Sequence, residues 1–144
     1  MTRLHQLLYT LILFTQTSYA SVNDRVDNDK QIHDLMFGSW VVSPKDELYT
    51  QGNGSISTYH NDGTLEYKQF NDAACTDLVL TLNARWSVTD RKLVIIVSEE
   101  DQLAYGLPQT ITDIVHEISN NNSILISTEG RPQHRVKSGK CISK

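Results

Sequence analysis

Residues that could perform catalysis are few in this sequence of 144 residues, and they are dispersed along it. The histidines in question are His33, His60, His116 and His134, and no two of them share a helix face or alternating positions of one strand. A zinc site needs three or four convergent ligands, so the sequence predicts no metal site. His116 precedes Glu117, and neighbouring side chains of a strand point to opposite faces. We therefore interpret His116 as a surface residue or as part of a sheet wall.

Motifs of the large enzyme classes are also missing from the sequence. It contains no Gly-x-Ser-x-Gly nucleophile elbow, no phosphate-binding P-loop and no His-Glu-x-x-His zinc motif. The acidic run Glu99-Glu100-Asp101 has two interpretations, of which a solvated turn is simpler than a cation site. We expect a protein that is not an enzyme and that carries no cofactor.

The sequence has two cysteines, Cys75 and Cys141. An even number of cysteines in an exported chain favours a disulfide between them. The closed loop would be long, and its chain entropy would stabilise the fold by roughly 4 kcal/mol. The alternatives are two buried free thiols or, less favourably, a metal site, because no histidine lies at ligand spacing from either cysteine.

Residues 1–20 have the pattern of a secretory signal peptide. Arg3 supplies a positive charge, an apolar run follows at residues 7–14, and Ser18-Tyr19-Ala20 places small residues at both positions that signal peptidase reads. The apolar run is too short to span a bilayer, and the alternative is a helix packed on the domain. We expect a periplasmic or secreted protein that has no membrane span after cleavage.

The rest of the chain predicts one domain behind a short leader. Residues 21–30 are polar and charged, which is typical of a flexible leader, and residues 31–144 have the size of one domain. A short helix is expected over residues 31–37, with Asp29 available as its N-cap. The formal net charge of −4 argues against nucleic acid or an anionic membrane as the main partner.

Beyond residue 38 the apolar pattern changes to a period of two, which is typical of strands. Strands are predicted over residues 39–43, 55–60, 64–70, 78–88, 92–97, 109–119, 124–126 and 134–137. Asn61-Asp62-Gly63 is the strongest hairpin turn, because Asp-Gly tolerates the positive φ that such turns need. Residues 109–119 also fit a helix, but their Thr and Ile content favours a strand with a bulge. Residues 98–108 are expected to form a loop.

The strand predicted over residues 78–88 has the clearest alternation. Its in-phase apolar residues are Leu78, Leu80, Leu82, Ala84, Trp86 and Val88. About eight consecutive antiparallel strands, with no helix long enough for a crossover, predict an all-β, up-and-down antiparallel barrel with a short N-terminal helix. The interior of such a barrel holds either side chains or one small ligand, and the sequence leaves both fillings open.

Three short motifs occur together in an order and spacing that resemble one family. They are Gly38-x-Trp40, Tyr59-x-x-Asp62-Gly63-Thr64 and Trp86-Ser87-Val88-x-x-x-x-Leu93-x-Ile95. The sequence resembles the lipocalin-like domains of small exported bacterial proteins, from about residue 37 to residue 129. The resemblance implies a calyx-shaped antiparallel barrel with Trp40 near its closed end, and structural roles for Gly38, Asp62 and Gly63.

The same resemblance has implications for two further features of the chain. Many lipocalins tie a C-terminal tail to the barrel wall with a disulfide, which implies that Cys75 pairs with Cys141. Lipocalins also pack an arginine over the tryptophan, and Arg131 and Arg135 are the candidates for that role in this sequence. The connection over residues 98–108 is longer than the family pattern.

The resemblance and the paired apolar strands predict a non-enzymatic protein that binds a small apolar or amphipathic molecule. The predicted ligand-binding residues are Tyr59, Tyr67, Leu80, Leu82, Trp86 and Ile95. Core packing is an alternative role for Trp40 and Trp86. The alternative function is a periplasmic interaction protein, such as an inhibitor of a secreted hydrolase or an immunity protein, that uses residues 98–108 and 21–30 as contact surfaces. A filled interior would favour that alternative.

Overall fold

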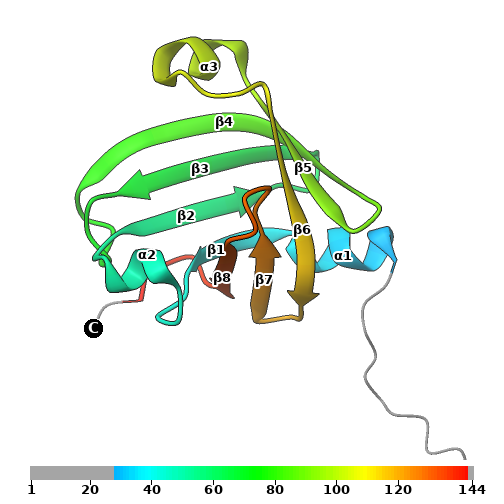
Figure 1. Ribbon diagram of the computed structural model, residues 1–144, viewed down its shortest axis with the longest axis horizontal. Coiled ribbons are helices and arrows are strands. Elements are labelled where there is room, and N and C mark those ends of the chain that lie inside the picture. Colours follow the sequence, from blue (N-terminus) through cyan, green and yellow to red (C-terminus); the bar gives the residue numbers. More distant parts are fainter. Residues whose placement is uncertain (1–27, 143–144) are drawn as a thin grey trace, which may run out of the picture.

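Antiparallel strands form a closed barrel in the computed structural model, which describes residues 28–142 of the chain (Figure 1). Within that range each strand pairs with its neighbours in sequence, and the last strand returns to pair with the first. The strands are β1 (Gly38–Val42), β2 (Gly54–Tyr59), β3 (Thr64–Phe70), β4 (Leu78–Thr89), β5 (Lys92–Val97), β6 (Thr110–Ile118), β7 (Asn122–Ile126) and β8 (Pro132–Lys137). The predicted eight-stranded up-and-down barrel is confirmed.

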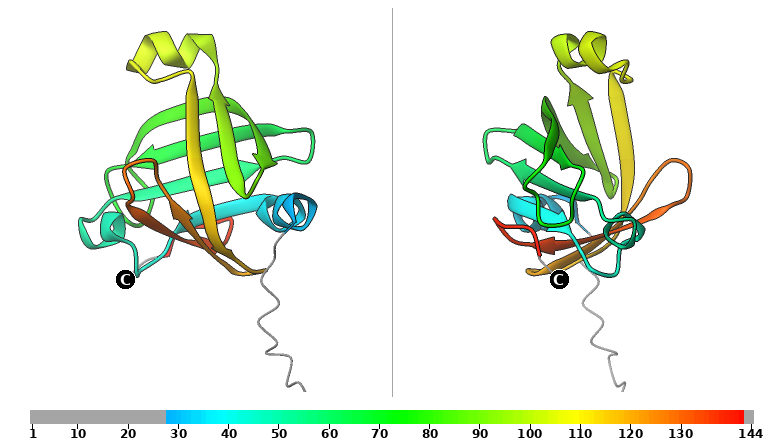
Figure 2. Two further views of the ribbon diagram at one scale, coloured as in Figure 1. Left: turned by 45° about the vertical axis from the view of Figure 1, so that its right-hand side comes forward. Right: turned by 90° about the vertical axis from the view of Figure 1, so that its left-hand side faces the viewer.

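Three short helices accompany these strands in the described part of the chain (Figure 2). They are α1 (Asp29–Met36), α2 (Glu47–Thr50) and α3 (Glu99–Tyr105). The first precedes the barrel and packs against β4 and β6, the second joins β1 to β2, and the third joins β5 to β6. The predicted signal peptide (residues 1–20) and most of the predicted leader (residues 21–30) lie outside the described residues.

Helix α1 begins two residues before the helix predicted from the sequence. Its N-cap is Asn28, whose side chain accepts a hydrogen bond from the backbone N–H of Gln31, so the prediction of Asp29 as the cap is wrong. The Asp29 carboxylate instead accepts hydrogen bonds from the backbone N–H groups of Asp90, at 2.8 Å, and Arg91, at 2.9 Å. These two bonds lower the pKa of Asp29, and the bond from Arg91 has the larger effect. They also hold the start of α1 against the β4–β5 turn.

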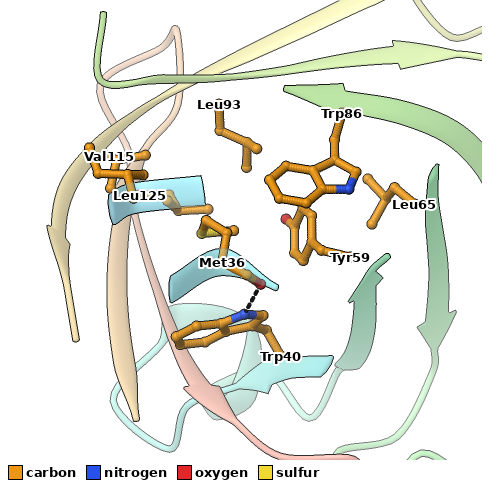
Figure 3. Close-up of a cluster of buried hydrophobic side chains, with 9 residues drawn as sticks. Met36, Trp40, Tyr59, Leu65, Trp86, Leu93, Val115 and Leu125 are labelled. Atoms are coloured by element: carbon orange, nitrogen blue, oxygen red, sulfur yellow. Dashed lines mark hydrogen bonds between the residues drawn. The ribbon is translucent and has the colours of Figure 1, made fainter. Parts of the chain in front are cut away.

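One end of the barrel is filled by a cluster that we call the closed-end core (Figure 3). Its members are Ile32, Met36, Trp40, Tyr59, Leu65, Trp86, Leu93, Val115 and Leu125. Two of them come from the buried face of α1, and each of the others except Trp40 projects from a different strand between β2 and β7. The alternating apolar positions of the sheet and the apolar face of the helix therefore meet in one place.

Trp40 lies at this closed end, as the resemblance implied. The indole is 1% exposed, and its Nε1–H donates to the carbonyl oxygen of Met36 at 2.7 Å (Figure 3). The cation over the ring is a lysine rather than either predicted arginine. Lys137 of β8 lies opposite Trp40 of β1 in the register, and its Nζ lies 5.2 Å from the ring centroid. The expectation for Arg131 and Arg135 is therefore wrong.

Gly38 is required by its backbone conformation and by its neighbour. Its φ is +108°, a value that side chains with a Cβ rarely adopt, and a Cβ built there would lie 3.1 Å from the Cε of Lys137. The β2–β3 hairpin has the predicted turn, with Gly63 at a φ of +81°. There the Asp62 Oδ1 accepts hydrogen bonds from the Thr64 hydroxyl, at 2.6 Å, and from the Thr64 backbone N–H, at 2.9 Å.

Residues 109–119, whose pattern fits either a helix or a strand, contain strand β6, so the predicted strand is confirmed. It pairs with both β5 and β7, and its register with β7 shifts between Val115 and Glu117, where the predicted bulge lies.

The disulfide between Cys75 and Cys141 is also formed and joins the β3–β4 loop to the C-terminal tail, with the two Cα atoms 5.9 Å apart.

The sequence analysis missed α2 and treated α3 as a loop. The acidic run lies in the first turn of α3, where carboxylates complement the helix dipole, and the Ser98 side chain caps the helix. The Asp101 carboxylate accepts hydrogen bonds from the Asn83 backbone N–H, at 2.7 Å, and from the Ser98 hydroxyl, at 2.9 Å. Gly106 ends the helix in the left-handed conformation. The acidic run is therefore a capped helix start rather than a solvated turn.

Candidate ligand-binding cavity

A cavity of about 420 Å³ occupies the half of the barrel interior that the closed-end core leaves unfilled. Met36 and Trp40 line the cavity from the closed end. Leu48 of α2, the β7–β8 turn (residues 127–131) and Leu107 after α3 also line it. Its volume lies within the range of about 300–1,000 Å³ that is usual for small-molecule sites.

Five of the six predicted ligand-binding residues line this cavity. They are Tyr59, Tyr67, Leu80, Leu82 and Ile95. The alternation of β2, β3, β4 and β5 turns these side chains inward, and Ala84, Val97 and Ile111 extend the apolar wall. The structure thus brings these residues together, and their binding of a ligand stays a prediction.

Trp86, the sixth predicted residue, does not line the cavity and packs within the closed-end core. Its ring stacks on the His33 ring with centroids 4.4 Å apart. It also meets the Tyr59 ring edge to face, with centroids 5.1 Å apart (Figure 3). Its Nε1–H donates to the carbonyl oxygen of His60 at 3.0 Å. Core packing, the alternative role considered for this residue, is what the contacts of Trp86 support.

A buried ion pair joins the cavity wall to the segment that precedes α2. The Arg135 side chain on β8 is 9% exposed, and its Nη1–H donates to the Asp46 carboxylate at 2.9 Å. The same carboxylate accepts hydrogen bonds from the backbone N–H groups of His134, at 2.6 Å, and Leu48, at 2.9 Å. Asp46 thus neutralises Arg135 and caps α2 at the same time.

The ion pair continues into a chain of polar side chains that faces the cavity. The Arg135 Nη2–H donates to the Gln133 Oε1 at 3.0 Å, and the Gln133 side chain in turn hydrogen-bonds the Asp113 carboxylate. Asp113 is only 7% exposed, and its register partner on β5 is the fully buried Leu93. Burial raises the pKa of Asp113, and the Gln133 hydrogen bond and the Arg135 charge offset part of that rise. We call Asp46, Arg135, Gln133 and Asp113 the polar chain.

Hydroxyl groups complete the polar part of the cavity wall. Burial raises the pKa of the Tyr59 and Tyr67 phenols, so both are neutral hydroxyls at physiological pH. Ser57 and Ser123 also line the cavity. Ser123 is 2% exposed, and its Oγ has no hydrogen-bond partner among the residues that the structure describes. An apolar cavity with a few polar groups on one side suits an amphipathic occupant.

The sequence analysis missed the polar chain, although a signal for part of it was present. In β6 the pattern Ile111-x-Asp113-x-Val115 places an acid in phase with two apolar inward positions. In β8 the residues Gln133 and Arg135 share one face in the same way. A charged residue in phase with the inward positions of a barrel strand indicates a polar group in the interior.

The histidines and acidic residues of the described part of the chain are dispersed. Between residues 28 and 142, no three His, Cys, Asp or Glu side chains are grouped so that they could hold a metal ion. His33 stacks on Trp86, and His116 lies 3.9 Å from Glu117 with half of its side chain exposed. None of the helices in this part of the chain has the length and apolar character to cross a membrane.

Solved structures with the same architecture were found, although no protein-family profile and no curated protein matches this sequence. A lipocalin-like protein from Bacteroides uniformis ATCC 8492 superposes with a TM-score of 0.53, over 72% of this chain and 99% of that protein, at 16% identity. The chain has a lipocalin-like fold. An uncharacterized protein from Bacteroides eggerthii DSM 20697 aligns over the same shares of the two chains, with a TM-score of 0.47 and 11% identity. At these identities the likeness concerns the fold alone.

Proposed function

We propose that this protein is an exported, non-enzymatic carrier that binds a small amphipathic molecule inside its lipocalin-like barrel. The observation that supports the proposal is the cavity of about 420 Å³, whose wall combines apolar side chains from β4, β5 and β6 with the polar chain. Leu80, Leu82 and Ile95 lie on the inner face of a closed barrel without being fully buried. A ligand that covers them would remove this apolar surface from water.

The proposal of export depends on the pattern of residues 1–20 and on the disulfide. Disulfides persist in oxidising compartments such as the bacterial periplasm and the extracellular space. The bond between Cys75 and Cys141 therefore supports a periplasmic or secreted location for the mature chain.

The alternative role as an interaction protein has less support. We expected a filled interior in that case, and the interior holds a cavity instead. Leu103 and Tyr105 on α3 are exposed, but this surface carries no observation that points to a partner. The carrier role is therefore the one that we develop.

Filling the cavity tests the carrier role directly. A Leu82→Trp variant places a larger side chain in the cavity and should weaken the binding of a fluorescent amphipathic probe at least about tenfold, because probe and indole compete for one volume. Val79→Trp is the matched control, since Val79 lies near the start of the same strand and is 47% exposed. The control should bind the probe as the unaltered protein does.

Saturable binding of the probe by titration is the measurement, and thermal unfolding checks that both variants are folded. Equal binding by the Leu82→Trp and Val79→Trp variants, or no saturable binding by the unaltered protein, would contradict the carrier role. Native mass spectrometry of the protein as purified adds a second observation, because a carrier should retain an occupant in part of the population.

A further inference from the structure

The charges around the cavity are not balanced, and the imbalance selects among amphipathic ligands. Two arginines line the cavity, and each has a carboxylate partner of its own. The Arg135 Nη1 lies 2.9 Å from the Asp46 Oδ2, and the Arg131 Nη2 lies 2.7 Å from the Glu129 Oε2. Neither arginine is therefore a free cation that waits for an anionic ligand.

Asp113 is the acid on this wall that lacks such a partner. Among the described residues, no lysine or arginine lies within ion-pair distance of its carboxylate, and its hydrogen-bond contact is the Gln133 side chain. The Gln133 Oε1 already accepts a hydrogen bond from Arg135, so the Gln133 NH2 group is the part of the side chain that faces the Asp113 carboxylate. The polar chain thus begins at a neutralised ion pair and ends at a buried carboxylate.

A second group on the same wall also lacks a partner. The register pairs Ser123 on β7 with Arg135 on β8, and both side chains line the cavity. The Ser123 hydroxyl is buried and forms no hydrogen bond with the described residues. A buried hydroxyl without a partner is costly, so a polar group of an occupant would stabilise this part of the wall, which the register places beside Ile118 of β6 rather than beside Asp113.

We infer that the occupant of the cavity is an amphiphile whose polar end is a hydrogen-bond-donating cation, of the alkylammonium class, that binds Asp113. The inference rests on the proposed function and specifies its ligand. An ammonium group is compact, carries three donors and no acceptor, and so can satisfy the Asp113 carboxylate. A carboxylate at the same place would meet Asp113 without a free cation to compensate, which is unfavourable.

The apolar part of the ligand has a defined place in this arrangement. Asp113 lies beside Leu93 at the closed-end core, whereas Leu80, Leu82 and Ile111 line the wall of the cavity. An ammonium at Asp113 would therefore lie deep in the barrel, with its alkyl chain along the apolar wall. Burial of the alkyl chain supplies the driving force, and the charged end supplies the selectivity.

Three probes of equal chain length test the inference: decylamine, decanol and decanoate, each titrated by calorimetry into the unaltered protein at neutral pH. We expect decylamine to bind at least about tenfold more tightly than decanoate, with decanol between them, because the three have ten carbons each and differ in the charge and the hydrogen-bond donors of the polar end. This comparison needs no variant and so does not depend on how any substitution folds.

Two charge-removing variants locate the effect. Asp113→Asn keeps the shape of the side chain and should weaken decylamine binding at least about tenfold, while decanol changes less than about threefold. Glu117→Gln is the matched control, because it removes one negative charge from an exposed side chain of the same strand that does not line the cavity, and it should change decylamine binding less than about threefold.

The possible failures are distinguishable. Decanoate that binds as tightly as decylamine, or an Asp113→Asn variant that keeps the preference for decylamine, overturns the inference while the carrier role stands. A Glu117→Gln effect as large as that of Asp113→Asn also overturns it, because the preference would then come from overall charge. If none of the three probes binds the unaltered protein, the carrier role and the inference both fail.

Discussion

The two halves of the barrel interior belong to the same strands but are filled in different ways. At the closed end, Trp40, Trp86 and Leu93 are at most 4% exposed, and they pack against each other and against α1. In the other half, Leu80 and Leu82 also point inward, yet each keeps part of its surface uncovered. Inward-facing apolar side chains are therefore common to both halves, and only one half is a packed core.

The two halves differ in the side chains and elements that lie beside their apolar residues. The closed end receives a helix and two indole rings, which are large enough to fill it. The other half receives the polar chain, and Asp46 within that chain orients Arg135 while it caps α2. The periodicity of a strand therefore determines which side chains face inward. The size and charge of a few residues determine whether those inward side chains pack against one another.

The largest effect is expected from Trp40→Ala at the closed end. Truncation of a fully buried tryptophan removes its packing and its hydrogen bond to Met36, and should lower the free energy of unfolding by about 3–5 kcal/mol. Leu82→Ala, a residue of the cavity wall, should cost about 1 kcal/mol, because its side chain is only partly buried. Urea unfolding of both variants measures the difference. Similar losses would contradict the contrast between the halves.

A smaller effect is expected when the disulfide is removed. Replacement of Cys75 and Cys141 by serine frees the C-terminal tail from the β3–β4 loop and should lower the free energy of unfolding by about 2–4 kcal/mol. The closed-end core does not include this link, so the near-ultraviolet circular dichroism of its tryptophans should be retained. Loss of that signal in the native variant would mean that the core depends on the tether.

The smallest effect, of opposite sign, is expected from Asp113→Asn. The pKa of Asp113 is raised by burial above its ordinary value of 3.8, so the folded protein with an ionised Asp113 is destabilised above that raised pKa. Without ligand, the variant should be more stable than the unaltered protein at pH 7, by on the order of 1 kcal/mol. The advantage should shrink as the pH falls through the raised pKa toward 3.8.

Urea unfolding at several pH values between 4 and 7 measures this difference between the two proteins. The comparison isolates Asp113, because carboxylates with lowered pKa values, such as Asp29 and Asp62, contribute equally to both. A stability difference that does not vary with pH would show that the ionisation of Asp113 is not its cause.

Much of the fold could be predicted from the sequence because local patterns determine it. The alternation of β4, the Asp62-Gly63 turn and the apolar face of α1 are local signals, and each is confirmed. The capped start of α3 is local as well, but three acidic residues beside a serine also fit a solvated turn. The hydrogen bond from the Asn83 backbone N–H of strand β4 to the Asp101 carboxylate decides between the two, and the sequence does not reveal it.

The site was less predictable because it depends on how distant strands meet. Five of the six predicted residues line the cavity, since alternation alone turns them inward. Trp86 differs because α1 brings His33 onto its ring, a contact between segments more than fifty residues apart. The polar chain joins residues from the segment before α2, from β6 and from β8, and its hydrogen bonds follow only from the closed barrel.

The central claim is that the half of the interior opposite the closed-end core receives a ligand. Titration of the unaltered protein with decylamine, followed by methyl nuclear magnetic resonance, tests it most directly. We expect saturable shifts of the Leu80, Leu82 and Ile95 methyl signals, with little change at Leu93 and Val115, which do not line the cavity. Shifts confined to exposed residues such as Leu103, or equal shifts at Leu93 and Leu82, would contradict the claim.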